Sequence, residues 1–313
     1  MPMERKNLRV FEDAVSLLKD NWPTPLLKLK SETREGFEVW AKLEFYNPFS
    51  RSIKDRPVWL MLLRALEKND FNSLYEATSG NMGIALAALS NFYGKRFRAY
   101  IPRTTPTTTE IILRVYGVEV VRTDFETIDW DFIETVEADA KRDGAVNLNQ
   151  FKNDANFQSH YEYTGKELVE QLKSIGRKPT CLIAGIGTSG HIAALSMRLR
   201  EAFGDVKIVG VQPRKGESIP GIKRIETKPK WLAHASPWKI IDVSLEEAVK
   251  GSIEVARKEG IFIGLSSGAV FKAFQKIKNI LGHGVYVLIF PDDGFKYVEI
   301  FAKHLKINKR HSI

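Results

Sequence analysis

The chain has 313 residues, of which 43% are hydrophobic and 27% charged, and its formal net charge is +9. This composition is that of an ordinary globular protein and excludes a disordered chain, a collagen and a disulfide-stapled miniprotein. A single cysteine, Cys181, excludes an internal disulfide and a multi-cysteine metal site. The sequence has no apolar run of the roughly 20 residues that span a membrane, and its N-terminal segment lacks the apolar core of a signal peptide. We therefore expect a cytoplasmic protein without a membrane partner.

Basic residues outnumber acidic ones by 47 to 38, a surplus that nucleic-acid-binding proteins also show. Here the two signs are interspersed, as in RLREAF and IEVARKEG, and form no long basic block. We interpret the charge as a solvated surface and expect no nucleic-acid partner. A positive field still helps to collect small anions such as phosphate esters and carboxylates.

Short β-rich segments alternate with amphipathic helical segments along most of the chain. A capping box, Ser244 with Glu247, marks one helix start, and the segment 214–242 is expected to be irregular. A further strand–helix cycle is expected to begin at 145–149. The predicted strands are 37–43, 73–78, 97–102, 118–123, 180–184, 206–213 and 285–290, and the predicted helices are 54–68, 80–94, 105–117, 129–144, 154–172, 191–204, 244–260 and 268–280.

Repeated strand–helix–strand cycling predicts an α/β fold, with mostly parallel sheets covered by helices on both faces. The sequence shows no repeat of 20–50 residues, which argues against a solenoid. A closed eight-stranded barrel is the main alternative, but the irregular joins at 43–53 and 149–156 favour two open sheets with a crevice between them. Such sheets bind ligands at the carboxyl ends of their strands, so we expect the chemistry in strand-to-helix loops.

The loop GIGTSG at 185–190 follows a predicted buried strand and precedes a predicted helix. Glycines let backbone amides approach an anion, and a helix N-terminus favours negative charge there. We interpret the loop as a phosphate-binding loop. GxGxxG is also typical of nicotinamide dehydrogenases, which carry an acid at the end of the next strand. That strand ends here in Gln212 and Pro213, so a cofactor with one phosphate fits better.

Two further loops carry polar side chains at the start of a helix. TSGNMG at 78–83 combines hydroxyl groups with backbone amides, which suits either a bound carboxylate or plain helix capping. The loop 47–56 places Lys54 at a helix start, where the positive end of the dipole disfavours a charged amine. We expect the pKa of Lys54 to be lowered, as a Schiff-base lysine requires, although a solvated surface lysine is the alternative.

Together these loops resemble the fold-type II pyridoxal-phosphate family, especially its cysteine synthases. NPFSRSIKDR, TSGNMG, GIGTSG and LSSGA follow the order of the family's NPxxSxKDR-like, TSGNTG, GxGTGG and SSGA segments, and LNQFKNDAN with its following HY resembles another stretch. The likeness runs from about Thr24 to Phe295. It implies pyridoxal 5'-phosphate between two open three-layer α/β/α domains of tryptophan synthase β type. These are a smaller mobile domain at 42–152, which closes on the substrate carboxylate, and a larger phosphate-binding domain at 1–41 plus 153–313.

The resemblance also implies a homodimer and roles for individual residues. Lys54 would hold the cofactor and act as the catalytic base, Asn81 would contact its phenolic oxygen, and Ser266 would face its pyridine nitrogen. From the residues alone, Ser266 is also a candidate N-cap. The cofactor phosphate would bind at Gly187, Thr188, Ser189, Gly190 and His191. The substrate carboxylate would bind at Thr78, Ser79, Asn81 and Gln150.

Three positions depart from the family pattern. Met82 stands in place of a threonine, His191 in place of a frequent threonine, and Arg51 in place of a frequent glycine. The first departure bears on a side-chain contact in the carboxylate loop, and the second leaves the phosphate contact to backbone or imidazole.

The implied reaction is β-replacement, in which sulfide takes the place of the activated oxygen of an O-substituted L-serine and gives L-cysteine. The irregular segment carries Lys223 and Arg224, which resemble the cations of phosphoserine-using relatives; Arg51 and Arg103 are further candidates. O-phospho-L-serine is therefore favoured over O-acetyl-L-serine. Cystathionine β-synthase and serine/threonine dehydratase activities are the alternatives within the family. No metal is expected, because the histidines lack metal-ligand spacing.

Overall fold

A computed structural model describes residues 9–68 and 70–307 of the chain. The two ends of the predicted larger domain, 1–8 and 308–313, therefore lie outside the described residues, and so does much of the N-terminal segment that entered the expected location. Among the described residues, none of the helices combines the length and the apolar character that a membrane crossing requires.

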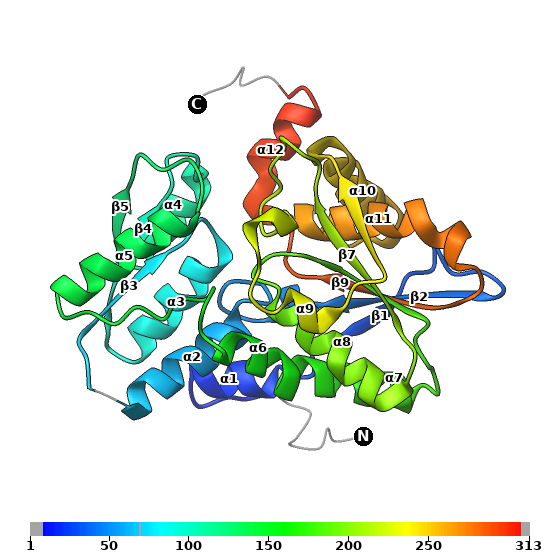
Figure 1. Ribbon diagram of the computed structural model, residues 1–313, viewed down its shortest axis with the longest axis horizontal. Coiled ribbons are helices and arrows are strands. Elements are labelled where there is room, and N and C mark those ends of the chain that lie inside the picture. The colour runs from blue at the N-terminus through cyan, green and yellow to red at the C-terminus, as the bar shows by residue number, and fades with distance from the viewer. Residues whose placement is uncertain (1–8, 69, 308–313) are drawn as a thin grey trace.

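The larger of two sheets has the strand order β1-β2-β9-β6-β7-β8 (Figure 1). Its strands run parallel except β1, which pairs with β2 in the antiparallel sense. In the centre, β2 and β9 pair in register from Phe37 with Gly284 to Leu43 with Phe290. The strands are β1 Leu26–Lys28, β2 Phe37–Leu43, β6 Cys181–Gly185, β7 Lys207–Pro213, β8 Lys239–Val243 and β9 Gly284–Phe290.

Helices cover both faces of this sheet because its central strands are apolar on both sides. Alternate residues of β6 show the division: Ile183 packs in the core under α10 and α11, whereas Leu182 and Ala184 pack in the core under α7 and α8. In Figure 1, α10 and α11 lie above the sheet, and α7 and α8 lie below it. These helices are α7 Lys166–Ser174, α8 Gly190–Phe203, α10 Leu245–Glu259 and α11 Leu265–Leu281.

The smaller sheet has the order β3-β4-β5, and all three strands are parallel. One face packs under α2, α3 and α4, and the other packs under α5. Helices α2 and α6 contact each other and run between the two sheets in Figure 1. The elements are β3 Ser73–Ala77, β4 Arg96–Ile101, β5 Glu119–Arg122, α2 Asp55–Lys68, α3 Asn81–Phe92, α4 Thr107–Val115, α5 Trp130–Arg142 and α6 Ala155–Ser159.

The prediction of two open, mostly parallel sheets is confirmed, and the closed barrel is wrong, because the strands form two separate sheets. The smaller sheet lies inside the predicted domain 42–152. The boundaries and the mobility of the two domains stay predictions.

Some predicted local features are wrong. The segment 214–242 contains a helix, α9 Leu232–Ala235, and most of β8. The helix predicted at 154–172 is interrupted by a π-helical stretch at His160–Gly165. The segment 145–149 forms a bridge between Val146 and Leu74 rather than a strand. Helices α1 Ala14–Asp20 and α12 Val298–His304 and strand β1 were not anticipated.

Candidate active site

The loop that carries Lys54 is clamped onto the carboxyl end of β9. The Ile53 amide donates to the Pro291 carbonyl at 2.8 Å, and Ser52 forms an isolated antiparallel β-bridge with Asp292. The carboxylate of Asp55 accepts hydrogen bonds from the amides of Phe49 and Ser50 at 2.7 and 2.9 Å. These hydrogen bonds fix the backbone around Lys54, so the lysine side chain extends from a defined position just before α2.

Arg51, in the same loop, has a φ of +50°, in the left-handed region where glycine is unstrained. This conformation is a physical reason to expect glycine at this position. The arginine side chain is tied instead to Asp293, with 2.8 Å between Nε and Oδ2.

Burial lowers the pKa of the Lys54 amine to about 8. The neighbouring charge of Lys223 lowers this pKa further, whereas the carboxylate of Asp292 raises it. The predicted direction of the shift is confirmed, but its main cause is loss of water rather than the helix dipole. A partly buried amine of this kind does not fit the alternative of a solvated surface lysine.

The GIGTSG loop joins β6 to α8 and requires its glycines. A Cβ on Gly187 would lie 2.8 Å from the Gly221 carbonyl oxygen, and one on Gly190 would lie 2.6 Å from Oδ1 of Asn156. Ser189 has a φ of +68° and accepts a hydrogen bond from the Trp231 amide. Because the first amides of α8 have no intrahelical acceptor, the loop is built to receive an anion.

His191 follows this loop, and its ring is buried against that of His160, 6.0 Å away between centroids. His160 in turn shares a 3.0 Å hydrogen bond with the Thr164 hydroxyl. Burial and the nearby Lys54 charge lower the pKa of His191 to about 3, so the imidazole is neutral. Its Nε2 has no hydrogen-bond partner within the described part of the chain.

Asn81, the first residue of α3, reaches from the smaller sheet to the end of β9. Its Nδ2 donates to Oδ2 of Asp292 at 2.7 Å, and the hydroxyl of Tyr297 donates to the same oxygen at 2.5 Å. The Oδ1 atom of Asn81 is buried and has no partner among the described residues. The sequence reading missed Asp292 and Tyr297. The pair of aspartates directly after a buried strand was the available signal.

The predicted carboxylate-binding residues surround the start of α3. The Thr78 hydroxyl accepts from the Gly83 backbone amide in the first turn of α3 at 2.8 Å, whereas the N-cap residue, Gly80, makes no side-chain hydrogen bond. Ser79 is exposed. Gln150 is buried, and its backbone amide donates to the Glu76 carboxylate at 3.3 Å. Thr78 therefore satisfies one backbone amide at the start of α3, and the carboxylate interpretation stays a prediction.

Ser266 lies in the first turn of α11 and is buried. The prediction that it caps this helix is wrong, because the N-cap is Gly264 and the cap has no side-chain hydrogen bond. A Cβ on Gly221 would lie 3.6 Å from the Ser266 hydroxyl. Because Gly221 also packs against Gly187, Ser266 lies near the phosphate loop. Its predicted role at the pyridine nitrogen stays a prediction.

A cavity of about 560 Å³ opens between the start of α5 with its preceding loop and the segment after β7. Phosphate-loop residues Gly187 and Thr188 form part of its wall, and so does Lys223. The Lys223 ammonium donates to the Ile128 carbonyl and lies 4.7 Å from the centroid of the Phe151 ring. Burial lowers its pKa to about 8.

The four candidate cations differ in their partners. Arg224 is 2.9 Å from Glu226 and 3.2 Å from Asp242, Arg51 is paired with Asp293, and Arg103 is paired with Glu126. Lys223 has no ion pair with a carboxylate in residues 9–68 and 70–307. It is therefore the candidate with its charge most available to a bound anion.

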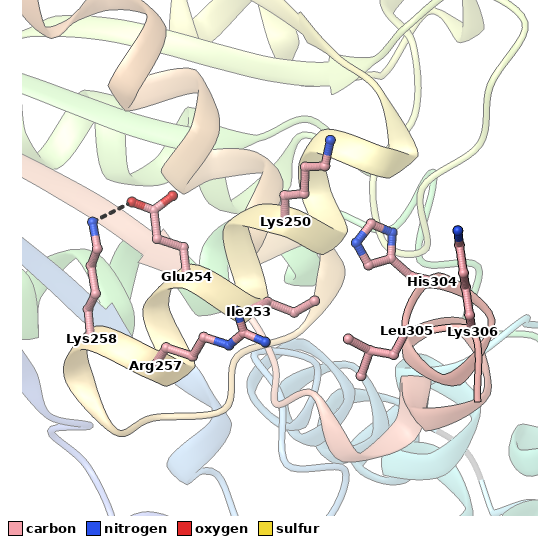
Figure 2. Close-up of a pocket in the computed structure, with 8 residues that line it drawn as sticks. All are labelled: Lys250, Ile253, Glu254, Arg257, Lys258, His304, Leu305 and Lys306. Atoms are coloured by element: carbon pink, nitrogen blue, oxygen red, sulfur yellow. Dashed lines mark hydrogen bonds and ion pairs between the residues drawn. The ribbon is translucent and has the colours of Figure 1, made fainter.

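Figure 2 shows a second hollow, of about 590 Å³, between α10 and the end of α12. Its wall is formed mostly by charged side chains, with Ile253 and Leu305 between them, and one of its lysines, Lys258, is paired with Glu254 at 2.8 Å. It contains none of the predicted site residues.

The residues beside Lys54 fit a phosphorylated aromatic aldehyde. The glycine-lined turn suits the phosphate, and Lys54 supplies an amine with a lowered pKa. The unpartnered atoms of His191 and Asn81 are polar groups that a polar ligand would satisfy. No cluster of three or more His, Cys, Asp or Glu side chains among the described residues is placed to hold a metal ion.

Comparisons with known proteins agree with this assignment. The family model described as "Pyridoxal-phosphate dependent enzyme" matches residues 17–292. The chain therefore belongs to this family, its cofactor is pyridoxal phosphate, and the nicotinamide dehydrogenase alternative is wrong. The resemblance seen in the sequence is confirmed.

Two similar curated proteins are cysteine synthases. Cysteine synthase B of Escherichia coli (strain K12) is 34% identical over 281 residues, covering 88% of this chain and 91% of that protein. Cysteine synthase of Aquifex aeolicus is 34% identical over 299 residues, covering 90% of each. The chain is thus a pyridoxal-phosphate enzyme of the cysteine synthase type.

Other relatives carry different names. N-(2-amino-2-carboxyethyl)-L-glutamate synthase of Cupriavidus metallidurans is 30% identical and covers 91% of this chain and 88% of that protein. The crystal structure of O-ureido-L-serine synthase superposes with a TM-score of 0.87 at 26% identity, covering 97% of this chain and 98% of that one. The predicted fold class is confirmed by this match, whereas the roles predicted for single residues stay predictions.

Proposed function

We propose that the enzyme replaces the activated oxygen substituent of O-phospho-L-serine with sulfide and releases L-cysteine. The observation that carries the choice of donor is Lys223, a partly buried cation on the wall of the cavity that reaches the phosphate loop, with no carboxylate ion pair among the described residues. A phosphate leaving group would bring the missing negative charge. O-acetyl-L-serine, which has a neutral ester, would leave Lys223 with only the nearby charge of Asp129, which makes no ion pair with it in the described residues.

Bound pyridoxal phosphate supplies the electron sink that stabilises negative charge at the substrate α-carbon. Lys54 provides an amine that takes the α-proton, and its pKa of about 8 keeps a useful neutral fraction near neutral pH. Thr78, Ser79 and Gln150 hold the substrate carboxylate. Asn81 and Ser266 orient the ring, and residues 187–191 bind its phosphate. The positive charge of Lys223 stabilises the departing phosphate, and Arg224, on the wall of the same cavity, adds a second positive charge.

The size of the cavity favours a second candidate for the incoming nucleophile. A volume of about 560 Å³ is much larger than sulfide needs. Homocysteine would fit this space, which would make the activity that of a cystathionine β-synthase. Serine/threonine dehydratase activity, by contrast, needs no room for a second substrate.

Cofactor attachment is tested on the purified holoprotein. Borohydride reduction followed by peptide mass spectrometry should place the pyridoxyl group on Lys54, and Lys54→Ala should lose the visible absorbance of the bound cofactor. A pyridoxyl group on another lysine would reject the proposed site.

Donor preference is tested by comparing kcat/KM for O-phosphoserine and O-acetylserine. Lys223→Met should lower the phosphoserine value by about 10–100-fold, because a hydrogen bond to a charged group is worth roughly 1.5–3 kcal/mol. Arg224→Met should have a smaller selective effect because Glu226 and Asp242 already neutralise this arginine. The exposed Lys239→Met serves as the control. Equal losses on both donors in Lys223→Met would refute the assignment.

The homodimer, the cytoplasmic location and the closure of the smaller domain are retained as proposals. The family resemblance supports the first and third, and the sequence composition supports the second. Size-exclusion chromatography with light scattering would test the oligomeric state.

A further inference from the structure

The Asp292 carboxylate joins the two halves of the site. It follows β9 of the larger sheet, is 1% exposed, and accepts a hydrogen bond from Asn81 at the start of α3. Tyr297, on the short turn before α12, donates to the same oxygen. One carboxylate oxygen therefore fixes a side chain that the smaller sheet presents to the cofactor.

The backbone of Asp292 is fixed by the start of α11. The Gly264 amide donates to its carbonyl at 2.9 Å, and the Ser267 hydroxyl donates to the same carbonyl at 3.3 Å. The second carboxylate oxygen, Oδ1, is unpartnered in the described residues and packs against Gly264, where a Cβ would lie 2.0 Å away. The carboxylate has no room to rotate away from Asn81.

Several charged or titratable groups surround this carboxylate. The negative charge of Asp292 raises the pKa of the Lys54 amine, and the positive charge of Lys223 lowers it. The charge of Lys296 lowers the pKa of Asp292 and that of Asp293 raises it. Tyr297, on the turn before α12, donates a hydrogen bond to Asp292. Burial and the charge of Lys54 lower the pKa of the imidazoles of His160 and His191, so these rings are neutral.

The hydrogen-bond pattern favours the ionised form of Asp292. Two donors point at one oxygen, and donors stabilise a carboxylate over its protonated form. Burial acts in the opposite direction and raises the Asp292 pKa. The charge of Lys296 and the hydrogen bonds from Tyr297 and Asn81 act against the effect of burial on this pKa.

We propose that Asp292, held by Tyr297, is a positioning residue that supplies the fixed negative charge opposite Lys54 and orients the Asn81 amide toward the cofactor. The proposal rests on Lys54 being the cofactor lysine. It explains why a buried carboxylate with an unpartnered oxygen lies beside the reactive amine.

The test is the pH dependence with which cofactor-free protein captures pyridoxal phosphate, followed by visible absorbance in a stopped-flow instrument. Capture requires the neutral Lys54 amine, so the wild-type rate should rise with a midpoint near pH 8. Asp292→Asn removes the opposing charge and should move the midpoint about one pH unit lower. Tyr297→Phe should move it in the same direction by less, because it weakens the ionised form of Asp292.

Asp293→Asn is the matched control, because this buried neighbour pairs with Arg51 and Lys296 and makes no hydrogen bond with Asn81 or Tyr297 among the described residues. It should leave the midpoint unchanged. Tyr297→Phe retains every carboxylate, so it gives an answer even if Asp292→Asn does not fold. Unchanged midpoints in the folded variants, with only a lower melting temperature, would overturn the proposal and leave a structural role.

Failure of the proposed cofactor site has a different signature. If borohydride labelling finds the pyridoxyl group away from Lys54 in wild-type protein, both the site and the Asp292 proposal are rejected. If labelling falls on Lys54 while the midpoint does not move, the Asp292 proposal alone is rejected.

Discussion

Glu76 is a carboxylate buried at the end of β3, beneath the loop that leads to Gln150. Its carboxylate accepts hydrogen bonds from the backbone amides of Asn149 and Gln150 at 3.0 and 3.3 Å. Burial is the main influence on it and raises its pKa to about 7, against an ordinary value of 4.5. The folded protein therefore holds a proton on Glu76 that the unfolded chain releases near pH 4.5.

This difference gives a testable pH dependence of stability. Because the folded pKa lies above the unfolded one, stability is greatest below about pH 4.5 and falls as the pH rises to about 7, by about 3 kcal/mol for this group. Glu76→Gln has no proton to lose, so its melting temperature relative to wild type should increase from pH 5 to pH 8. Circular dichroism melts at each pH provide the measurement.

The exposed Glu134→Gln on α5 is the control for this comparison and should keep the wild-type pH profile. Asp55, whose pKa burial also raises, is present in all three proteins and cancels. Parallel profiles for wild type and Glu76→Gln would show that Glu76 is already ionised in the fold.

At the residue scale, the sequence located the groups that a motif marks and missed those that only the fold brings near. Lys54 and the phosphate loop were identifiable from local sequence, because one is a lysine at a predicted helix start and the other is a glycine-rich loop between a predicted strand and a predicted helix. Asp292 and Tyr297 lie more than 200 residues from Asn81, and Asp292 contacts it only when α3 packs against the end of β9. No local pattern specifies that contact.

The start of α11 shows how a motif glycine also serves packing between elements. A Cβ on Gly268 would lie 2.1 Å from the Ala248 carbonyl oxygen of α10. A Cβ on Gly251 would likewise lie 2.4 Å from the Gly268 carbonyl oxygen. The two helices thus cross with their backbones in contact, and this crossing sets the position of Ser266.

Gly268→Ala should therefore destabilise the protein by about 3 kcal/mol, because neither backbone can shift without disturbing the core. Gly176→Ala is the matched control, with a φ of +64° and open space around the added methyl group, and should cost about 1 kcal/mol. Urea denaturation of both variants measures the difference. Equal losses would mean that α10 and α11 separate easily.

At the element scale, alternation of apolar runs and amphipathic helices was enough to predict most helices and strands and both sheets. The missed strand β8, KIIDV, is a short edge strand with exposed Lys239 and Asp242 and follows a segment with few periodic signals. The Ser266 cap failed because Gly264, two residues earlier, has the extended backbone of an N-cap. Periodicity predicts that an element exists better than where it begins.

The whole molecule is held together near the active site by a buried ionic network. Arg56, fully buried in α2, is 2.6 Å from Glu44 after β2 and 2.7 Å from Glu167 in α7. Lys42 of β2 completes the network at 2.9 Å from Glu167. Because Arg56 lies two residues after Lys54, the network ties the lysine-bearing helix to the larger sheet.

Arg56→Met should therefore reduce both stability and cofactor binding. Removing one member leaves Glu44 and Glu167 buried with too little positive charge, which costs about 3–5 kcal/mol in such networks. The displaced start of α2 should also weaken pyridoxal phosphate binding, measured by fluorescence titration of cofactor-free protein at a temperature where the variant is folded. Arg142→Met, which removes an exposed arginine paired with Asp139, should change neither quantity measurably. A destabilised Arg56→Met protein with unchanged cofactor affinity would show that the network supports the fold without positioning Lys54.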